Sequence, residues 1–128
     1  MAIPEDRRYH AEHTWAQQTG ELVTTGITDH AQDELGDIVY LQLPDAGATV
    51  ARGSSMGEIE SVKTVSDLIS PVTGVVQERN EAALEKPEVV NSDPYGDGWL
   101  VRVRLSDPSE LAGLLSAADY QSLTEAQH

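Results

Sequence analysis

The chain has 128 residues, which suits one ordinary domain with a continuous core. Its eight basic and 22 acidic residues leave a formal net charge of −14, which argues against binding to nucleic acids or to anionic membranes. The absence of cysteine excludes disulfides and thiolate metal sites, and no apolar run approaches the ~20 residues that cross a bilayer.

Runs of β-branched and apolar residues, separated by turn residues, predict a series of short strands. In chain order they are Thr14–Gln17, Glu21–Ile27, Asp37–Leu43, Gly57–Val62, Thr64–Ser70, Val72–Glu78 and Trp99–Leu105. A turn at Thr19-Gly20 would join the first two as a hairpin. The last strand alternates most regularly, with Arg102 and Arg104 opposite its apolar face. We expect Trp15 and Trp99 to be core residues at strand starts.

Helical signals occur at one internal position and in the tail. Thr28-Asp29 is a typical N-cap for a short helix over His30–Leu35, which Gly36 would end. Asp107-Pro108 starts a helical stretch in the tail. Apolar residues there recur at helical spacing: Leu111, Leu114 and Leu115, then Tyr120 and Leu123 in a helix over Ala117–Ala126 that Ser116 caps.

These elements predict one mainly β domain over residues 1–128. The strands would form a β-sandwich or flattened barrel with a core over about residues 9–105. A short internal helix and a C-terminal helical segment over about residues 107–126 would complete it.

The most informative residue is Lys63, one of only two lysines in the chain. It lies between two predicted strands, where a tight hairpin turn would hold its amine in solvent. A carrier with a swinging arm requires such a lysine, because a modifying enzyme and later several active sites must all reach it. The alternative is an ordinary solvated turn lysine.

The glycine spacing around Lys63 favours the carrier interpretation. Gly47 lies 16 residues before it and Gly74 lies 11 residues after it, each in a Pro-x-x-Gly segment. These offsets resemble those of the lipoyl- and biotinyl-domain family. Glu60, three residues before the lysine, and the absence of flanking methionines favour lipoate over biotin.

From about Tyr9 to Leu123, the sequence resembles the glycine cleavage system H-protein family. The matching segments include His13–Trp15, Gly26–Gln32, Leu35–Val39, Glu60–Lys63, Val90–Tyr95 and Gly98–Trp99. The resemblance implies a lipoyl-domain-like β-sandwich and a lipoate attached covalently to Lys63, within the recognition context of Glu60, Ser61 and Val62. It implies that the chain is not an enzyme but a carrier of an aminomethyl group.

The resemblance also implies a set of partner enzymes. These are a glycine decarboxylase with pyridoxal phosphate, a folate-dependent aminomethyltransferase, a dihydrolipoyl dehydrogenase with FAD, and a lipoyl or octanoyl transferase or lipoate ligase. The start of the chain lacks a secretion signal, so we expect a bacterial cytoplasmic protein, although a mature mitochondrial form would look similar.

In that family the loaded arm is thought to fold into a surface cleft, where carboxylates can pair with its ammonium. Asp67 matches a family position suited to this role. The position between His13 and Trp15 is typically glutamate in the family, but it is Thr14 here, and Glu12 could substitute. We expect Asp67, Glu12 and Thr14 to contribute to docking of the arm.

Three other functions remain open. An H-like protein could relay lipoate to other complexes. This alternative is retained because Thr14 replaces the glutamate that is typical of the family. A lipoyl domain of a 2-oxoacid dehydrogenase is disfavoured because the chain has no Ala/Pro linker and no acyltransferase domain. An unmodified acidic interaction module is the third. No metal site is expected: His10 and His13 lack a third ligand, and the loop after Asp93 departs from the calcium-binding pattern.

Overall fold

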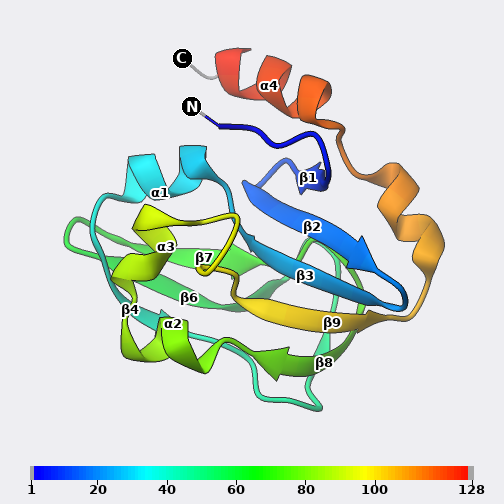
Figure 1. Ribbon diagram of the computed structural model, residues 1–128, viewed down its shortest axis with the longest axis horizontal. Coiled ribbons are helices and arrows are strands. Elements are labelled where there is room, and N and C mark those ends of the chain that lie inside the picture. The colour runs from blue at the N-terminus through cyan, green and yellow to red at the C-terminus, as the bar shows by residue number, and fades with distance from the viewer. Residues whose placement is uncertain (1, 127–128) are drawn as a thin grey trace.

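The computed structural model describes residues 2–126, in which nine strands form two antiparallel sheets (Figure 1). The large sheet has the strand order β1 (Arg8–His10), β2 (Thr14–Thr19), β3 (Leu22–Ile27), β9 (Val101–Leu105), β8 (Gly74–Arg79) and β5 (Thr49–Val50). The small sheet has the order β4 (Ile38–Gln42), β6 (Ser55–Ser61) and β7 (Val65–Ile69). A sandwich of two sheets is the predicted architecture, and it is confirmed.

Short helices lie at the edges of the sheets. At one end, on the left of Figure 1, are α1 (Asp29–Leu35), α2 (Glu81–Glu85) and α3 (Glu88–Ser92). The tail follows β9 as the 3₁₀ helix η1 (Pro108–Gly113) and then α4 (Ala117–Ala126), which packs on β1 near the N-terminus. Within residues 2–126, no helix is long and apolar enough to span a membrane.

Apolar side chains from both sheets meet in one buried cluster. Val23 and Val103 of the large sheet belong to it together with Leu41, Ile59 and Leu68 of the small sheet. The two sheets therefore face each other across a shared core, whose burial is the main stabilising contribution.

A second cluster, which we call the aromatic cluster, consists of Tyr9, Trp15 and Tyr120 under α4. The rings of Tyr9 and Tyr120 stack with centroids 4.8 Å apart. The Trp15 indole N–H donates to the carbonyls of Ile27 and Pro94, both at 3.0 Å. The cluster ties the C-terminal helix to the large sheet and confirms Trp15 as a core residue.

All seven predicted strands and the capped helix α1 exist with small shifts of their bounds. The Thr28 side chain accepts a hydrogen bond from the Ala31 N–H, and Gly36 ends the helix at φ 77°. The sequence did not reveal β1, β5, α2 and α3, which have only two to five residues each. Elements this short show no readable periodicity.

The interpretation of Trp99 as a core residue at a strand start was wrong. β9 begins at Val101, and the fully buried residue is Leu100. Trp99 is half-buried, with the Arg102 guanidinium 4.1 Å above its ring. Because Leu100 donates its N–H to Thr25 outside the regular ladder, the strict alternation fails at this end of the strand.

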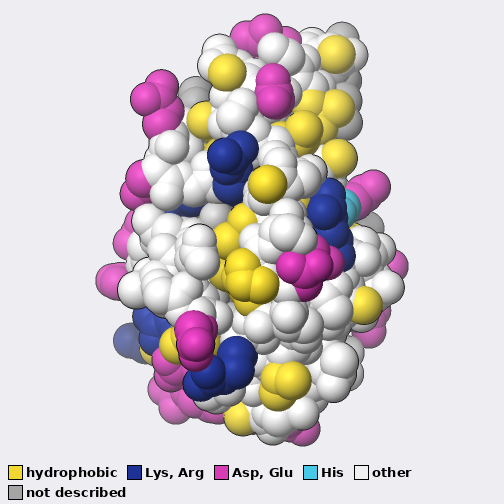
Figure 2. Space-filling view, turned by 90° about the vertical axis from the view of Figure 1, so that its right-hand side faces the viewer, with side chains coloured by type: hydrophobic (Ala, Val, Ile, Leu, Met, Phe, Trp, Pro, Cys, Tyr) yellow, Lys and Arg dark blue, Asp and Glu magenta, His cyan; other side chains and the backbone are white. Residues whose placement is uncertain are grey.

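The first tail segment is a 3₁₀ helix that Asp107 caps, rather than the regular helix that the leucine spacing suggested. It ends at Gly113, and Leu115 pairs with Tyr9 through two backbone hydrogen bonds of 2.8 and 2.9 Å. The tertiary bridge to β1 therefore overrides the local helical preference. Figure 2 shows this side of the molecule, where acidic and basic side chains are interspersed.

Candidate functional site

Lys63 lies at the tip of the β6–β7 hairpin, which projects past α1 in Figure 1. The Ser61 N–H donates to the Thr64 carbonyl at 2.8 Å and closes the turn. The nearly buried Ser61 hydroxyl accepts from the backbone N–H groups of Lys63 and Thr64, both at 3.2 Å. Ser61 thus fixes the backbone of the turn, while Val62 and Lys63 stay exposed.

The Lys63 side chain runs toward the C-terminal end of α1. Its Nζ lies 3.3 Å from the Glu34 carbonyl, in the last turn of that helix. A Cβ atom added at Gly36 would lie 2.9 Å from Lys63 Cε, so the lysine stem would have to move to make room for it. Within residues 2–126, Lys63 forms no salt bridge. The amine is therefore exposed and lightly held, as an attachment point requires.

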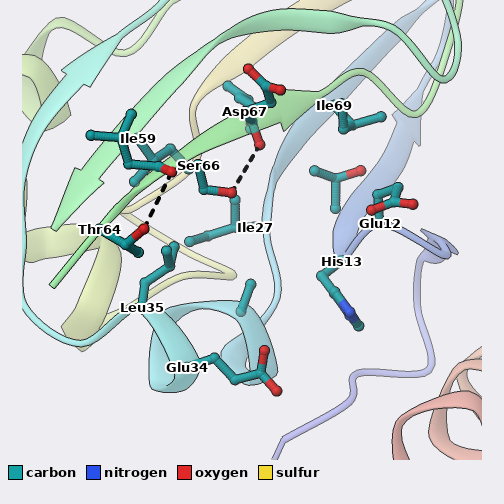
Figure 3. Close-up of a pocket in the computed structure, with 14 residues that line it drawn as sticks. Glu12, His13, Ile27, Glu34, Leu35, Ile59, Thr64, Ser66, Asp67 and Ile69 are labelled. Carbon is teal, nitrogen blue, oxygen red and sulfur yellow. Dashed lines mark hydrogen bonds between the residues drawn. The ribbon is translucent and has the colours of Figure 1, made fainter. Parts of the chain in front are cut away.

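A cleft of about 460 Å³ begins at Thr64, the residue after the lysine (Figure 3). It lies between β7, helix α1 and the start of β2. Its lining residues are Glu12, His13, Thr14, Ile27, Ala31, Glu34, Leu35, Ile59 and Thr64–Ile69. Because β7 pairs only with β6, the other edge of β7 is not covered by a strand. The cleft thus has an apolar floor and polar groups along its rim.

All three residues expected to dock the arm line this cleft: Glu12, Thr14 and Asp67. Figure 3 shows the side chains of Glu12 and Glu34 beside the cleft, and that of Asp67 at its edge, with its carboxylate pointing away from Ser66 and Ile27. The Asp67 carboxylate accepts a hydrogen bond of 3.4 Å from the Ser55 hydroxyl. Glu12 and Asp67, which are 55 residues apart in sequence, therefore lie at the same cleft.

Thr14 differs from its charged neighbours because it is buried at the start of β2. Its Oγ1 makes no hydrogen bond to any part of the chain that the structure describes. An unsatisfied buried hydroxyl costs about 1–3 kcal/mol. A polar group entering the cleft could supply the missing partner.

Two further residues shape the cleft: His13 and Glu34. His13 has a positive φ of 69°, and its Nδ1 lies 2.7 Å from the Tyr120 hydroxyl. That hydroxyl lies 2.7 Å from Thr28 Oγ1, next to the start of α1. Burial raises the pKa of Tyr120 well above its usual range, so this hydroxyl stays protonated. The aromatic cluster therefore supports the side of the cleft that His13 forms.

Glu34 was not assigned a role from the sequence. Its carboxylate pairs with His30 Nε2 at 2.9 Å, while its backbone carbonyl is the acceptor for Lys63. His30 is buried on α1, where its side chain contributes to packing. Glu34 could not be found from sequence because its contacts depend on how the hairpin packs against the helix. Among the described residues, no three potential ligands group into a metal site.

The comparisons with known proteins agree with this geometry. A family model described as "Glycine cleavage H-protein" matches residues 7–127. The chain is similar to a glycine cleavage system H protein of Anaeromyxobacter sp. (strain K), with 47% identity over 127 residues that cover 99% of each chain. It is 52% identical to one from Beutenbergia cavernae over 127 residues, which are 99% of this chain and all of that protein.

A solved structure is similar as well. The crystal structure of a glycine cleavage system H protein from Mycobacterium marinum superimposes with a TM-score of 0.89 at 43% sequence identity. The match covers 96% of this chain and 99% of that one.

Proposed function

The chain belongs to the glycine cleavage H-protein family, and on that premise we propose that it is the lipoyl carrier of the glycine cleavage system, with Lys63 as its attachment residue. The observation that carries the assignment of the residue is the exposed amine at the tip of a braced hairpin, beside a cleft. The other lysine, Lys86, lies instead at the end of the five-residue helix α2.

Attachment requires one new amide bond. The Lys63 nitrogen, after losing a proton, attacks the carboxyl carbon of an activated octanoyl or lipoyl group. The bond from that carbon to its leaving group, an adenylate or a carrier thiol, breaks, and the nitrogen gives up a second proton. The turn at Ser61–Thr64 holds the nitrogen outside the fold so that an enzyme can reach it.

The residues of this chain hold and present the arm. Once attached, the dithiolane of the lipoyl group supplies the chemistry by accepting an aminomethyl group on sulfur. The carrier is not catalytic in this scheme, since no side chain of the cleft has to make or break a bond. Tethering raises the local concentration of the arm near each partner's active site.

We assign Glu12, Thr14 and Asp67 to the loaded arm. An aminomethyl group carries an ammonium, which carboxylates attract and which can donate to the Thr14 hydroxyl. Support comes from the shared cleft and from the unsatisfied Oγ1 of Thr14. Glu12 thereby supplies the charge that Thr14 lacks at the position between His13 and Trp15.

The partners expected from the function are glycine decarboxylase, aminomethyltransferase, dihydrolipoyl dehydrogenase and an enzyme that attaches the arm. A protein with a net charge of −14 favours partners with basic surfaces, because long-range attraction speeds encounter. A bacterial cytoplasmic location stays a prediction. The family match over residues 7–127 supports the carrier over a lipoyl domain of a 2-oxoacid dehydrogenase or a lipoyl relay.

The test is reconstitution with purified glycine decarboxylase, glycine and labelled bicarbonate. The lipoylated protein should support exchange of label into the carboxyl group of glycine, because only a carrier can accept and return the aminomethyl group. The unmodified protein and the Lys63→Arg variant, treated identically, should not. A fully lipoylated protein that supports no exchange would contradict the carrier function.

A further inference from the structure

The turn that joins β1 to β2 carries two residues of the cleft, Glu12 and His13. The turn is short, because His10 at the end of β1 pairs with Thr14 at the start of β2. Figure 3 shows the Glu12 side chain beside the cleft, on this turn. Whatever fixes the backbone of the turn therefore also fixes where the Glu12 carboxylate lies.

The backbone of this turn is strained and is held by hydrogen bonds to His10. His13 adopts φ 69°, a left-handed conformation that costs a residue with a side chain about 1–2 kcal/mol. The His13 N–H donates to the His10 carbonyl at 2.9 Å. The Glu12 N–H donates to the His10 ring nitrogen Nδ1 at 3.0 Å. The first bond is made by the backbone alone, whereas the second depends on the His10 side chain.

The bond from Glu12 determines the protonation state of the His10 ring. A backbone N–H can only donate, so Nδ1 must be unprotonated and the ring proton must lie on Nε2. An imidazolium carries a proton on both nitrogens and cannot accept a hydrogen bond. Protonation of His10 therefore breaks the bond to Glu12 and places two donors against each other.

The surroundings of His10 favour the neutral ring. The charged groups that act on it are Arg52, from the loop between β5 and β6, and Glu12 of the turn itself. Partial burial, and then the Arg52 guanidinium, lower the pKa of His10 below its ordinary value of 6.5, although the Glu12 carboxylate opposes them. The guanidinium is held in place because it donates to the Gly113 carbonyl at 3.0 Å. At neutral pH the ring therefore accepts the Glu12 N–H, and it loses this ability in acid.

We propose that His10 is a positioning residue for the loaded arm: its neutral ring holds the backbone of Glu12 so that the Glu12 carboxylate stays at the cleft, and protonation of the ring releases it. Docking of the ammonium of the arm is then stronger above the titration of His10 than below it. This inference rests on the proposed function, in which Glu12 attracts that ammonium.

The first measurement follows the turn by NMR in the unmodified protein. Between about pH 5 and about pH 8, where histidine changes charge, the Glu12 amide signal should move together with the nitrogen signals of the His10 ring. The midpoint should lie below the ordinary value of 6.5. His10→Asn is the conservative variant, because an asparagine side-chain oxygen also accepts the N–H two residues on and does not titrate. In that variant the Glu12 amide should no longer move with this midpoint.

The second measurement is retention of the aminomethyl group by the loaded arm. The lipoylated protein is loaded by glycine decarboxylase with glycine labelled at its α-carbon and is then separated from the enzyme. Water cleaves the aminomethyl group from sulfur, which leaves a thiol and releases ammonium and labelled formaldehyde. At about pH 8, release from His10→Ala should be about two- to fivefold faster than from the unchanged protein, which corresponds to the loss of one exposed ion pair. His10→Asn should match the unchanged protein.

The pH profile separates positioning from a merely structural role. As pH falls through the titration of His10, release from the unchanged protein should accelerate relative to His10→Asn. The two proteins share their other histidines and the intrinsic pH dependence of hydrolysis, so both cancel in this ratio. Glu12→Gln removes the charge but keeps the bond to His10, so its release should be fast throughout the range. Urea unfolding of each variant measures any general loss of stability.

The proposal fails in ways that can be told apart. A Glu12 amide signal that does not follow the titration of His10 shows that the ring does not hold the turn. If the signal does follow it, equal release from His10→Ala and the unchanged protein removes the role of His10 in docking and leaves the carrier function intact. Equal release from Glu12→Gln as well removes Glu12 from the arm site. A lipoylated protein that cannot be loaded refutes the proposed function.

Discussion

The two sheets of this molecule differ in whether their charged side chains form salt bridges. On the large sheet, Arg79, Arg102 and Arg104 each pair with a carboxylate at 2.5–2.9 Å. The small sheet has carboxylates but no basic residue in its strands, and its exposed side chains include Tyr40 and Val65. The arginines of β8 and β9 are thus paired with carboxylates of the same chain, whereas the carboxylates in the strands of the small sheet form no salt bridge among the described residues.

The same division applies to stability. The aromatic cluster and the C-terminal helix belong to the large sheet, and their buried area and hydrogen bonds stabilise the fold. The Lys63 hairpin is held by backbone pairing and by the Ser61 hydroxyl, and its tip buries little. Substitutions on the large-sheet side should therefore affect folding, and those at the hairpin should affect modification and recognition.

Tyr120→Ala should produce the largest loss of stability. The substitution empties a fully buried site and removes the stack on Tyr9 and the hydrogen bonds to His13 and Thr28. The expected cost is about 3–5 kcal/mol in urea unfolding. Tyr40→Ala is the matched control on the small sheet and should cost less than about 1 kcal/mol. Equal losses of stability for Tyr120→Ala and Tyr40→Ala would refute this division between the two sheets.

Alkaline pH should lower the stability that the aromatic cluster provides by less than Tyr120→Ala does, because the tyrosine rings stay in place. Burial raises the pKa of Tyr9 and of Tyr120 above the ordinary value of 10.0. A raised folded-state pKa gives stability that is complete below the unfolded-state pKa and is lost as pH rises above it. Urea unfolding should therefore show falling stability above about pH 10. Tyr120→Phe should reduce that slope, and an unchanged slope would contradict the assignment to this cluster.

Gly36→Ala should cost about 1–3 kcal/mol, because its backbone conformation of φ 77° and ψ −158° is essentially restricted to glycine. Gly20→Ala is a matched control at φ 63° with open space around it. Both should lower stability in urea unfolding. Only Gly36→Ala should also shift the side-chain NMR signals of Lys63, whose Cε occupies the space next to Gly36. Unperturbed Lys63 signals would mean that the stem does not lie on α1.

Lys63→Arg should have the smallest effect on folding, within about 0.5 kcal/mol, because it is an exposed surface substitution. Its effect on modification should be complete, since a guanidinium is a poor nucleophile that stays protonated. Urea unfolding and intact mass after incubation with ligase, octanoate and ATP measure the two effects on one sample. A strongly destabilised variant would show that the residue supports the fold.

Sequence revealed those features that depend on local patterns. The strands, the Thr28 cap of α1 and the hairpin position of Lys63 each follow from neighbouring residues. The family resemblance pointed to Asp67, Glu12 and Thr14, which the structure brings to one cleft. The role of these three residues in docking stays a prediction.

Features that depend on long-range packing could not be predicted. Leu115 leaves its helical pattern because β1 offers it a backbone partner more than 100 residues away in sequence. The contact of Lys63 with the Glu34 carbonyl requires the hairpin to pack against α1. The row of Tyr40, Glu60 and Val65 depends on the register of three strands, including a bulge that sequence does not show.

The most direct test of the central claim is the mass of the protein purified from its native source, followed by peptide mapping. The account predicts one lipoyl or octanoyl group, in amide linkage to Lys63, and an unmodified Lys86. A native protein whose Lys63 is never acylated, or whose acyl group lies on Lys86, would contradict it.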